Sequence, residues 1–250
     1  MQLQRIFRRR FFQAAFFFFL SASLWSDSPL KDPGIPDGEL AVYREEIEGE
    51  FSYFTEQVSV KERNGSRFYE IVSKSDDEIT TLRIEEGTML PFSINTITKG
   101  SWFVSENSTV IELIADFERS GIMLLSFDDL PYLLRGYPFE ARTSVPVGFL
   151  QSSEDDDGIF DFDISVRFVD REFVSTADQQ IDCYKLQLRF RASGVMKILN
   201  GMVPKTYFWY SVQPPHYLVA YEGSSGAPGS PKRHVKIVEY SDWAADSGAD

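Results

Sequence analysis

Hydrophobic and polar residues alternate along much of the chain, most regularly between residues 160 and 190. Apolar side chains from Phe160 to Phe168 alternate with Asp, Ser and Arg, and the same pattern recurs from Tyr184 to Phe190. A period of two places successive side chains on opposite faces of a β-strand. One face can then be buried while the other meets water, as is typical of antiparallel sheets. Both segments are therefore predicted to be strands.

Further segments have strand-like patterns and are separated by turn residues. They cover residues 40–43, 51–60, 67–73, 79–84, 92–98, 109–116, 205–212, 217–221 and 234–240. Asn64-Gly65 and Asn200-Gly201 favour tight reversals, because both residue types tolerate a positive φ. One segment departs from this pattern. Residues 128–136 combine an Asp cap, Pro131 in the first turn and a closing Gly, which predicts a short helix.

Many short strands and one short helix predict a mainly β fold. The expected architecture is a large curved antiparallel sheet, open as a half-barrel, with the helix as an insert. Because no second linker, repeat or change of composition interrupts residues 39–243, this region is predicted to be a single β-rich domain. Prolines and glycines mark residues 24–38 as an extended leader, and the small, acidic residues 244–250 are predicted to be a disordered tail.

The N-terminus has the pattern of an export signal. Four arginines precede an apolar run over residues 11–20, and small residues follow, which predicts a signal peptide over residues 1–23. Cleavage is expected after Ser23, with Ser26 as the alternative; an uncleaved anchor and the twin-arginine route are also open. The apolar run is shorter than the roughly 20 residues that span a bilayer, so no stable transmembrane anchor is expected. The protein is predicted to be periplasmic or secreted.

Charge and composition exclude several classes of function. The 250 residues include 38 acidic and 25 basic side chains, for a net charge of −13. An acidic protein repels phosphate backbones, so nucleic-acid binding is not expected. With 2 His and 1 Cys, the chain has too few ligands for a zinc site, and neither a metal nor a cofactor is predicted.

No arrangement of nucleophiles and bases in the sequence indicates catalysis. Cys183 could pair with His216 or His234, but no signature places either histidine beside it. The neighbouring Asp182 would raise the pKa of the thiol and so reduce its reactivity. No Gly-x-Ser-x-Gly motif is present. The chain is therefore predicted to be non-enzymatic, with no catalytic residues.

The apolar faces of the predicted strands suggest a ligand. A curved sheet has more inner face than one short helix can cover, and the remainder would either be filled by loops, as part of the core, or be left as a hydrophobic cleft. This predicts binding of a lipid or another apolar ligand, with the cleft lined by Phe160, Phe162, Ile164, Val166, Phe168, Tyr184, Leu186, Leu188, Phe190 and Trp209. The alternative is a cell-envelope interaction or scaffold protein that holds a protein partner through strand edges or loops, without a small ligand.

Short motifs along the chain also carry a family resemblance. They lie at residues 38–43, 130–139, 182–186, 209–210, 214–219, 221–223 and 239–240. Together they resemble an uncharacterised family of exported bacterial proteins, a domain of unknown function. That family is similar in fold to the LolA and LolB lipoprotein carriers, in which an antiparallel half-barrel wraps around helices and shelters acyl chains. The resemblance implies a LolA-like half-barrel and, by analogy, a lipid or hydrophobic ligand. The chain departs from the carriers in having one evident helix and no lipid-attachment cysteine near the end of the signal.

Overall fold

The structure is a computed structural model that describes residues 29–98, 122–124, 129–149, 164–190, 205–224 and 230–241. The first group of strands comprises β1 (Leu40–Ile47), β2 (Glu50–Arg63), β3 (Ser66–Lys74), β4 (Glu78–Glu85) and β5 (Pro91–Thr98). The remaining strands are β6 (Ile122–Leu124), β7 (Ser144–Phe149), β8 (Ile164–Ser175), β9 (Gln180–Phe190), β10 (Thr206–Ser211), β11 (Leu218–Ser224) and β12 (Lys232–Ser241). A short helix, α2 (Leu130–Leu133), continues into the 3-10 turn η3 (Leu134–Gly136).

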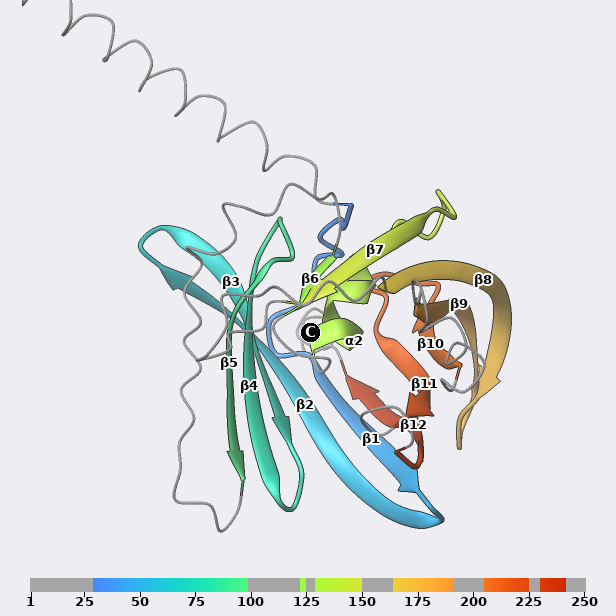
Figure 1. Cartoon of the computed structure of the whole chain (residues 1–250). Coiled ribbons are helices and arrows are strands. Elements are labelled where there is room, and N and C mark those ends of the chain that lie inside the picture. Colours follow the sequence, from blue (N-terminus) through green and yellow to red (C-terminus); the bar gives the residue numbers. More distant parts are fainter. Residues whose placement is uncertain are drawn as a thin grey trace, which may run out of the picture.

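All twelve strands belong to one open sheet with the order β5-β4-β3-β2-β1-β12-β11-β10-β9-β8-β7-β6 (Figure 1). Every pairing is antiparallel except that of β6 with β7. Two meanders make up the sheet, and the pairing of β1 with β12 joins them. Among the described residues, the predicted mainly β class, with one large antiparallel sheet and one short helix, is confirmed.

The observed strands follow the hydrophobic alternation closely. At the predicted reversal between β2 and β3, Asn64 and Gly65 both have positive φ values, of 54° and 81°. The sequence pattern did not predict β7, where Pro146 interrupts the alternation. The predicted strand over residues 109–116, the signal peptide over residues 1–23 and the tail over residues 244–250 lie outside the described residues.

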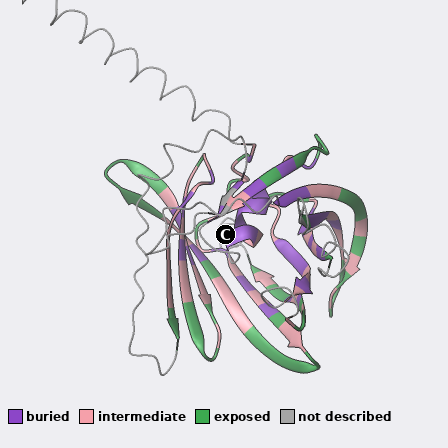
Figure 2. Cartoon of the chain, in the orientation of Figure 1, coloured by how far each residue is buried: buried purple, intermediate pink, exposed green. Residues whose placement is uncertain are grey.

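The helix and the core lie on one face of the sheet, which we call the inner face (Figure 1). Leu130, Leu133 and Leu134 of α2 and η3 are buried there. Burial is concentrated in the strands around α2, whereas several hairpin ends are exposed (Figure 2). A helix of four residues is too short to be stable alone, so its packing against the sheet must hold it in place. In the helices that the structure describes, no span is long and apolar enough to cross a membrane.

The described part of the leader, residues 29–38, is packed into the domain rather than lying outside it. Leu30 and Ile35 are buried, although they are too isolated to form a recognisable pattern in the sequence. The Asp32 carboxylate accepts hydrogen bonds from the Tyr69 hydroxyl, at 2.9 and 3.0 Å, and from the Gly87 amide, at 2.7 Å. The leader therefore ties β3 to the turn that precedes β5.

Candidate functional site

The side chains predicted to line a lipid cleft are largely part of the core. Ile164, Val166, Leu186 and Leu188 are buried, and they pack in one cluster with the side chains of α2 and η3. Phe168 and Tyr184 are partly buried against the same cluster. Phe160, Phe162 and the side chain of Phe190 lie outside the described residues. In the described structure, these side chains pack against the protein's own residues.

Phe139, which follows η3, covers much of this region. Its ring stacks on Tyr184 with centroids 4.5 Å apart, and its edge contacts the ring of His216 at 5.0 Å. The Tyr210 ring lies 6.0 Å away. The segment after η3 therefore acts as a second cover for the inner face, which the sequence pattern did not predict because it has neither helical nor strand periodicity.

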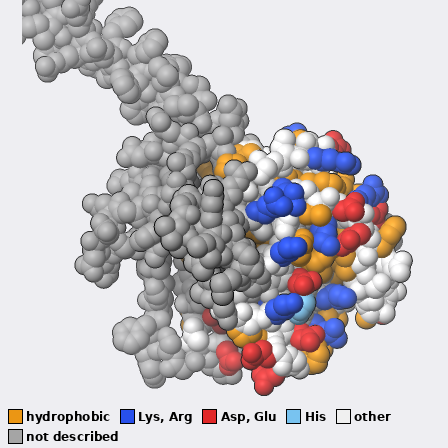
Figure 3. Space-filling model, turned by 45° about the vertical axis from the view of Figure 1, so that its right-hand side comes forward, with side chains coloured by type: hydrophobic (Ala, Val, Ile, Leu, Met, Phe, Trp, Pro, Cys, Tyr) orange, Lys and Arg blue, Asp and Glu red, His pale blue; other side chains and the backbone are white. Residues whose placement is uncertain are grey.

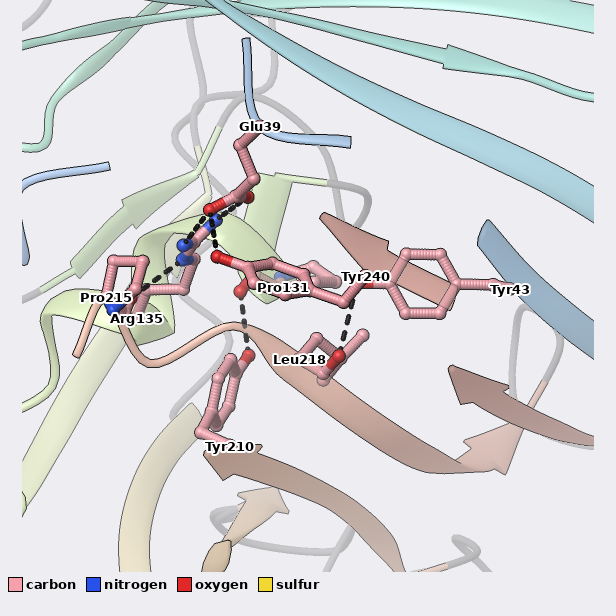
Figure 4. Close-up of polar contacts among 8 residues, drawn as sticks. All are labelled: Glu39, Tyr43, Pro131, Arg135, Tyr210, Pro215, Leu218 and Tyr240. Carbon is pink, nitrogen blue, oxygen red and sulfur yellow. Dashed lines mark hydrogen bonds and ion pairs between the residues drawn. The ribbon is translucent and has the colours of Figure 1, made fainter. Parts of the chain in front are cut away.

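A buried ion pair holds η3 on the inner face (Figure 4). The Arg135 guanidinium donates to both carboxylate oxygens of Glu39, at 2.6 and 2.8 Å, and both side chains are only 3–4% exposed. Tyr240 donates a further hydrogen bond to Glu39 at 3.0 Å, and Arg135 Nε donates to the Pro215 carbonyl at 3.1 Å. Removing two charges from water is costly, and these additional hydrogen bonds offset part of that cost. The pair links η3 to β12 and to the residues that precede β1 and β11.

Further polar groups on the inner face are also paired. The Tyr210 hydroxyl donates to the Pro131 carbonyl at 2.8 Å (Figure 4), and Tyr132 hydrogen-bonds to the Glu56 carboxyl. Burial raises the pKa of Glu56 to about 7, although the Tyr132 hydrogen bond and the charge of Arg135 act in the opposite direction. Because these polar groups are hydrogen-bonded to one another, we assign them a structural role, which is to hold α2 against the sheet.

A groove of about 440 Å³ lies on the opposite face of the sheet, which we call the outer face. Trp209 and Ala220, which are paired across β10 and β11, lie along it, and Phe173 and Val174 near the end of β8 are also among its lining residues. Its full lining is Arg44, Glu46, Glu172, Phe173, Val174, Trp209, Ala220, Tyr221, Glu222, His234, Val235 and Lys236. This groove, the outer groove, is the candidate functional site.

The end of β8 reaches across to β12 and forms one wall of the outer groove. Lys236 Nζ on β12 donates to the Ser175 carbonyl, the last residue of β8, at 3.0 Å. Phe173 on this wall is 68% exposed. Two further exposed aromatics, Phe51 and Tyr53, pair in register with Glu46 and Arg44 and so lie on the same face. The apolar surface therefore extends from the groove onto β2.

Trp209 is held by polar contacts within the site. Its indole N–H donates to Glu172 Oε1 at 2.6 Å, and Lys185 Nζ lies 2.9 Å from the same oxygen. Lys185 also lies over the Trp209 and Tyr207 rings, 4.8 and 4.9 Å from their centroids. The Trp209 hydrogen bond, and then Lys185, lower the pKa of Glu172. Because these contacts restrain the indole, it can bind a partner with little further loss of conformational freedom.

The charged side chains of the outer groove form two rows across the strands. Glu46 and Glu222 both pair in register with His234, which lies between them on β12. Arg44 and Lys236 are paired in the next row of the same face. Basic, acidic and apolar side chains are interspersed on the face in Figure 3, with histidine among them. The described residues hold no group of three or more His, Cys, Asp or Glu side chains that could bind a metal ion.

Trp209 is the one predicted lining residue that lies in the outer groove, and it faces away from the other members of that set. It was assigned to the inner face incorrectly. Its neighbours Phe208 and Tyr210 are both buried, so the alternation along β10 already indicates that Trp209 points outward. The charged groove residues were missed because charged residues on an outer face give no distinctive sequence signal.

Cys183 lies on the same side of β9 as Lys185, but it is fully buried, and the backbone of Val174 on β8 hydrogen-bonds to it. Burial, and then the charge of Asp182, raise the pKa of the thiol to about 12. The Cys183 thiol donates to the Ile181 carbonyl at 3.3 Å and His216 Nδ1 lies 2.9 Å from the Ser211 carbonyl oxygen, so each group contacts the backbone rather than the other. The structure therefore does not bring these groups together as a nucleophile and base.

No protein-family model matches the chain, and no curated protein matches it in sequence. Solved structures with similarity include a protein described as exported, with a YmcC-like fold, from Bacteroides fragilis (13% identity over 85% of this chain and 99% of that chain, TM-score 0.31). A DUF1329 family protein from Desulfovibrio piger is 13% identical over 92% of this chain and 94% of that chain, with a TM-score of 0.33. MucB in its complex with MucA from Pseudomonas aeruginosa is 9% identical, covering 88% of this chain and 56% of that chain, with a TM-score of 0.34. The function must be argued from the site itself.

Proposed function

We propose that the chain is a non-enzymatic exported protein that binds another protein of the cell envelope through the outer groove. The observation that carries this proposal is the aromatic surface of the groove. Phe51 and Tyr53 are each more than half exposed on the outer face, and Phe173, also more than half exposed, is among the residues that line the groove beside a restrained Trp209. Exposed apolar patches mark binding surfaces, and aromatic side chains are enriched in protein interfaces.

The inner face supports this choice over a lipid carrier. A lipid on the predicted lining would have to displace the Phe139 ring from its stack on Tyr184 and compete with the buried apolar side chains that already contact one another there. The outer groove can accept a partner without such a rearrangement.

The proposal of a non-enzymatic role rests on the protonation and burial of the Cys183 thiol. At neutral pH, a thiol with a pKa near 12 is almost entirely protonated, and only the thiolate attacks an electrophile. The burial of Cys183 also denies a substrate access to its sulfur. The envelope location rests on the signal-peptide pattern of residues 1–23.

Site-specific photocrosslinking in the cells that produce the protein tests this function. A photoreactive amino acid is placed at Phe173, at Tyr53 or, as a matched control, at Ile79, an exposed apolar residue of β4 that does not line the groove. We expect the first two positions to crosslink to the same envelope protein and Ile79 to give no such product. Equal labelling from all three positions, or no product from Phe173 and Tyr53, would refute the proposal.

Native mass spectrometry of the purified protein tests the lipid alternative in parallel. We expect the mass of the polypeptide alone after mild detergent-free purification. A stoichiometric lipid adduct, together with the absence of crosslinks from Phe173, would favour the carrier function instead.

A further inference from the structure

We propose that the occupant of the outer groove is a polypeptide segment of the partner that carries Arg or Lys next to an apolar side chain. This inference rests on the proposed function and adds the chemistry of the partner. Two features of the outer groove support it: which of its charged side chains already have partners within the protein, and where its apolar side chains lie relative to the remaining charges.

The cations of the outer groove are engaged within the protein. Lys236 Nζ donates to the Ser175 carbonyl, and the Arg44 guanidinium lies over the Phe51 ring, 5.2 Å from its centroid. Beside the groove, Lys185 binds Glu172. Each of these cations therefore already makes a contact within the protein that an acidic partner would have to share or replace.

Two carboxylates of the outer groove remain available. Glu46 and Glu222 make no ion pair with another residue in the part of the chain that the structure describes. They flank His234 on three adjacent strands, which places their backbones about 10 Å apart at a strand spacing of roughly 4.8 Å. A segment that crosses β1, β12 and β11 would pass both carboxylates in succession.

The apolar contacts lie beside this acidic row. Ala220 is two residues from Glu222 on β11, and Trp209 is paired with Ala220 on β10. Phe173 and Val174, near the end of β8, also line the groove. A basic side chain between the two carboxylates therefore leaves a neighbouring apolar side chain of the same segment near Trp209 and Phe173. The net charge of −13 on the whole chain also favours approach of a basic partner.

Selection from a phage-displayed library of random 12-residue peptides tests the inference on the purified full-length protein. We expect selected peptides to be enriched in Arg or Lys, over Asp or Glu, next to an aromatic or aliphatic residue. Binding of a selected synthetic peptide should shift the NMR resonance of the Trp209 indole N–H, which a site distant from the groove would leave unchanged. Affinity should also fall as NaCl is raised, because exposed ion pairs are screened by salt.

The double variant Glu46→Gln/Glu222→Gln removes both available charges without removing apolar contacts. Two exposed ion pairs are worth about 0.4–2 kcal/mol together, so the affinity for the selected peptide should fall about 2- to 30-fold. The matched control, Glu62→Gln/Asp77→Asn, removes two exposed charges that do not line the groove and should bind as the wild type does. Phe173→Ser should weaken binding without changing the preference for basic residues.

Enrichment of acidic peptides, no enrichment of either charge, or unchanged affinity in the Glu46→Gln/Glu222→Gln variant would overturn the inference. These results are distinguishable from failure of the proposed function. If Phe173 and Tyr53 crosslink to an envelope protein but the selected peptides are not basic, the outer groove is a protein-binding site whose occupant has a different chemistry.

Discussion

Replacing Glu56 by Gln should make the stability of the protein less dependent on pH. Glu56 lies on the inner face of β2, where burial raises its pKa from 4.5 to about 7. Gln is close to Glu in size, and its side-chain oxygen can still accept the hydrogen bond from Tyr132. The substitution therefore removes the titration while largely preserving the packing.

The sign follows from proton binding in the two states. Below pH 4.5, Glu56 is protonated in both the folded and the unfolded chain, and its contribution to stability is fully present. Between pH 4.5 and 7 the carboxyl ionises in the unfolded chain but stays protonated in the fold, so the free energy of unfolding decreases as pH rises. The shift corresponds to about 3 kcal/mol at about 1.4 kcal/mol per pH unit, which we reduce to about 2 kcal/mol because Glu56 is only half-buried.

Urea unfolding, followed by tryptophan fluorescence between pH 4.5 and 8, measures this effect. The free energy of unfolding of Glu56→Gln minus that of the wild type should rise by about 2 kcal/mol over this interval and then level off. Glu62→Gln, which removes an exposed carboxyl from the same strand, serves as the control and should change the stability little at any pH. A difference for Glu56→Gln that is constant with pH, or that falls as pH rises, would refute the reasoning.

Three further predictions concern the core and the leader. Arg135→Met should lower the free energy of unfolding, measured in urea, by about 3–5 kcal/mol, because it leaves the Glu39 carboxylate buried without its cation. The double variant Arg135→Met/Glu39→Leu should recover much of that loss, and a loss as large as that of Arg135→Met alone would contradict this. Gly136→Ala should destabilise the protein by about 1–3 kcal/mol, because the new Cβ would lie 2.5 Å from the Lys31 carbonyl oxygen. Proteolysis within residues 29–38 should therefore become faster, and an unchanged rate of proteolysis would contradict this. The Cys183 thiol should react with a disulfide reagent at pH 8 far more slowly in the native protein than in urea, and comparable rates would show that it is accessible.

Local chemistry predicted most of the fold. Alternation of apolar and polar residues defines a strand without reference to the rest of the chain, so segments such as 67–73 and 184–190 were recognisable as β3 and β9. Asn64-Gly65 predicted a hairpin, and the Asp-Leu-Pro start of the helical segment predicted α2, for similarly local reasons. β7 was missed because a proline interrupts its pattern.

The candidate site was much harder to predict, because alternation shows which side chains share a face of a strand but not what covers that face. In the described residues, the predicted apolar face of β8 and β9 packs in the core, and Phe139, which no alternation pattern marks, stacks on Tyr184 of that face. The outer groove exists because the end of β8 reaches β12, a contact between Ser175 and Lys236 that no local pattern encodes.

The order of amino acids thus specified most of the strands, the Asn64-Gly65 turn and the short helix, because backbone geometry and side-chain alternation act over a few residues. Three-dimensional packing alone specified the pairing of β1 with β12, the burial of Glu39 against Arg135 and the position of the outer groove. Each of these joins residues that are distant in the chain, and whether such a contact forms depends on the free energy of the whole assembled sheet rather than on any one segment.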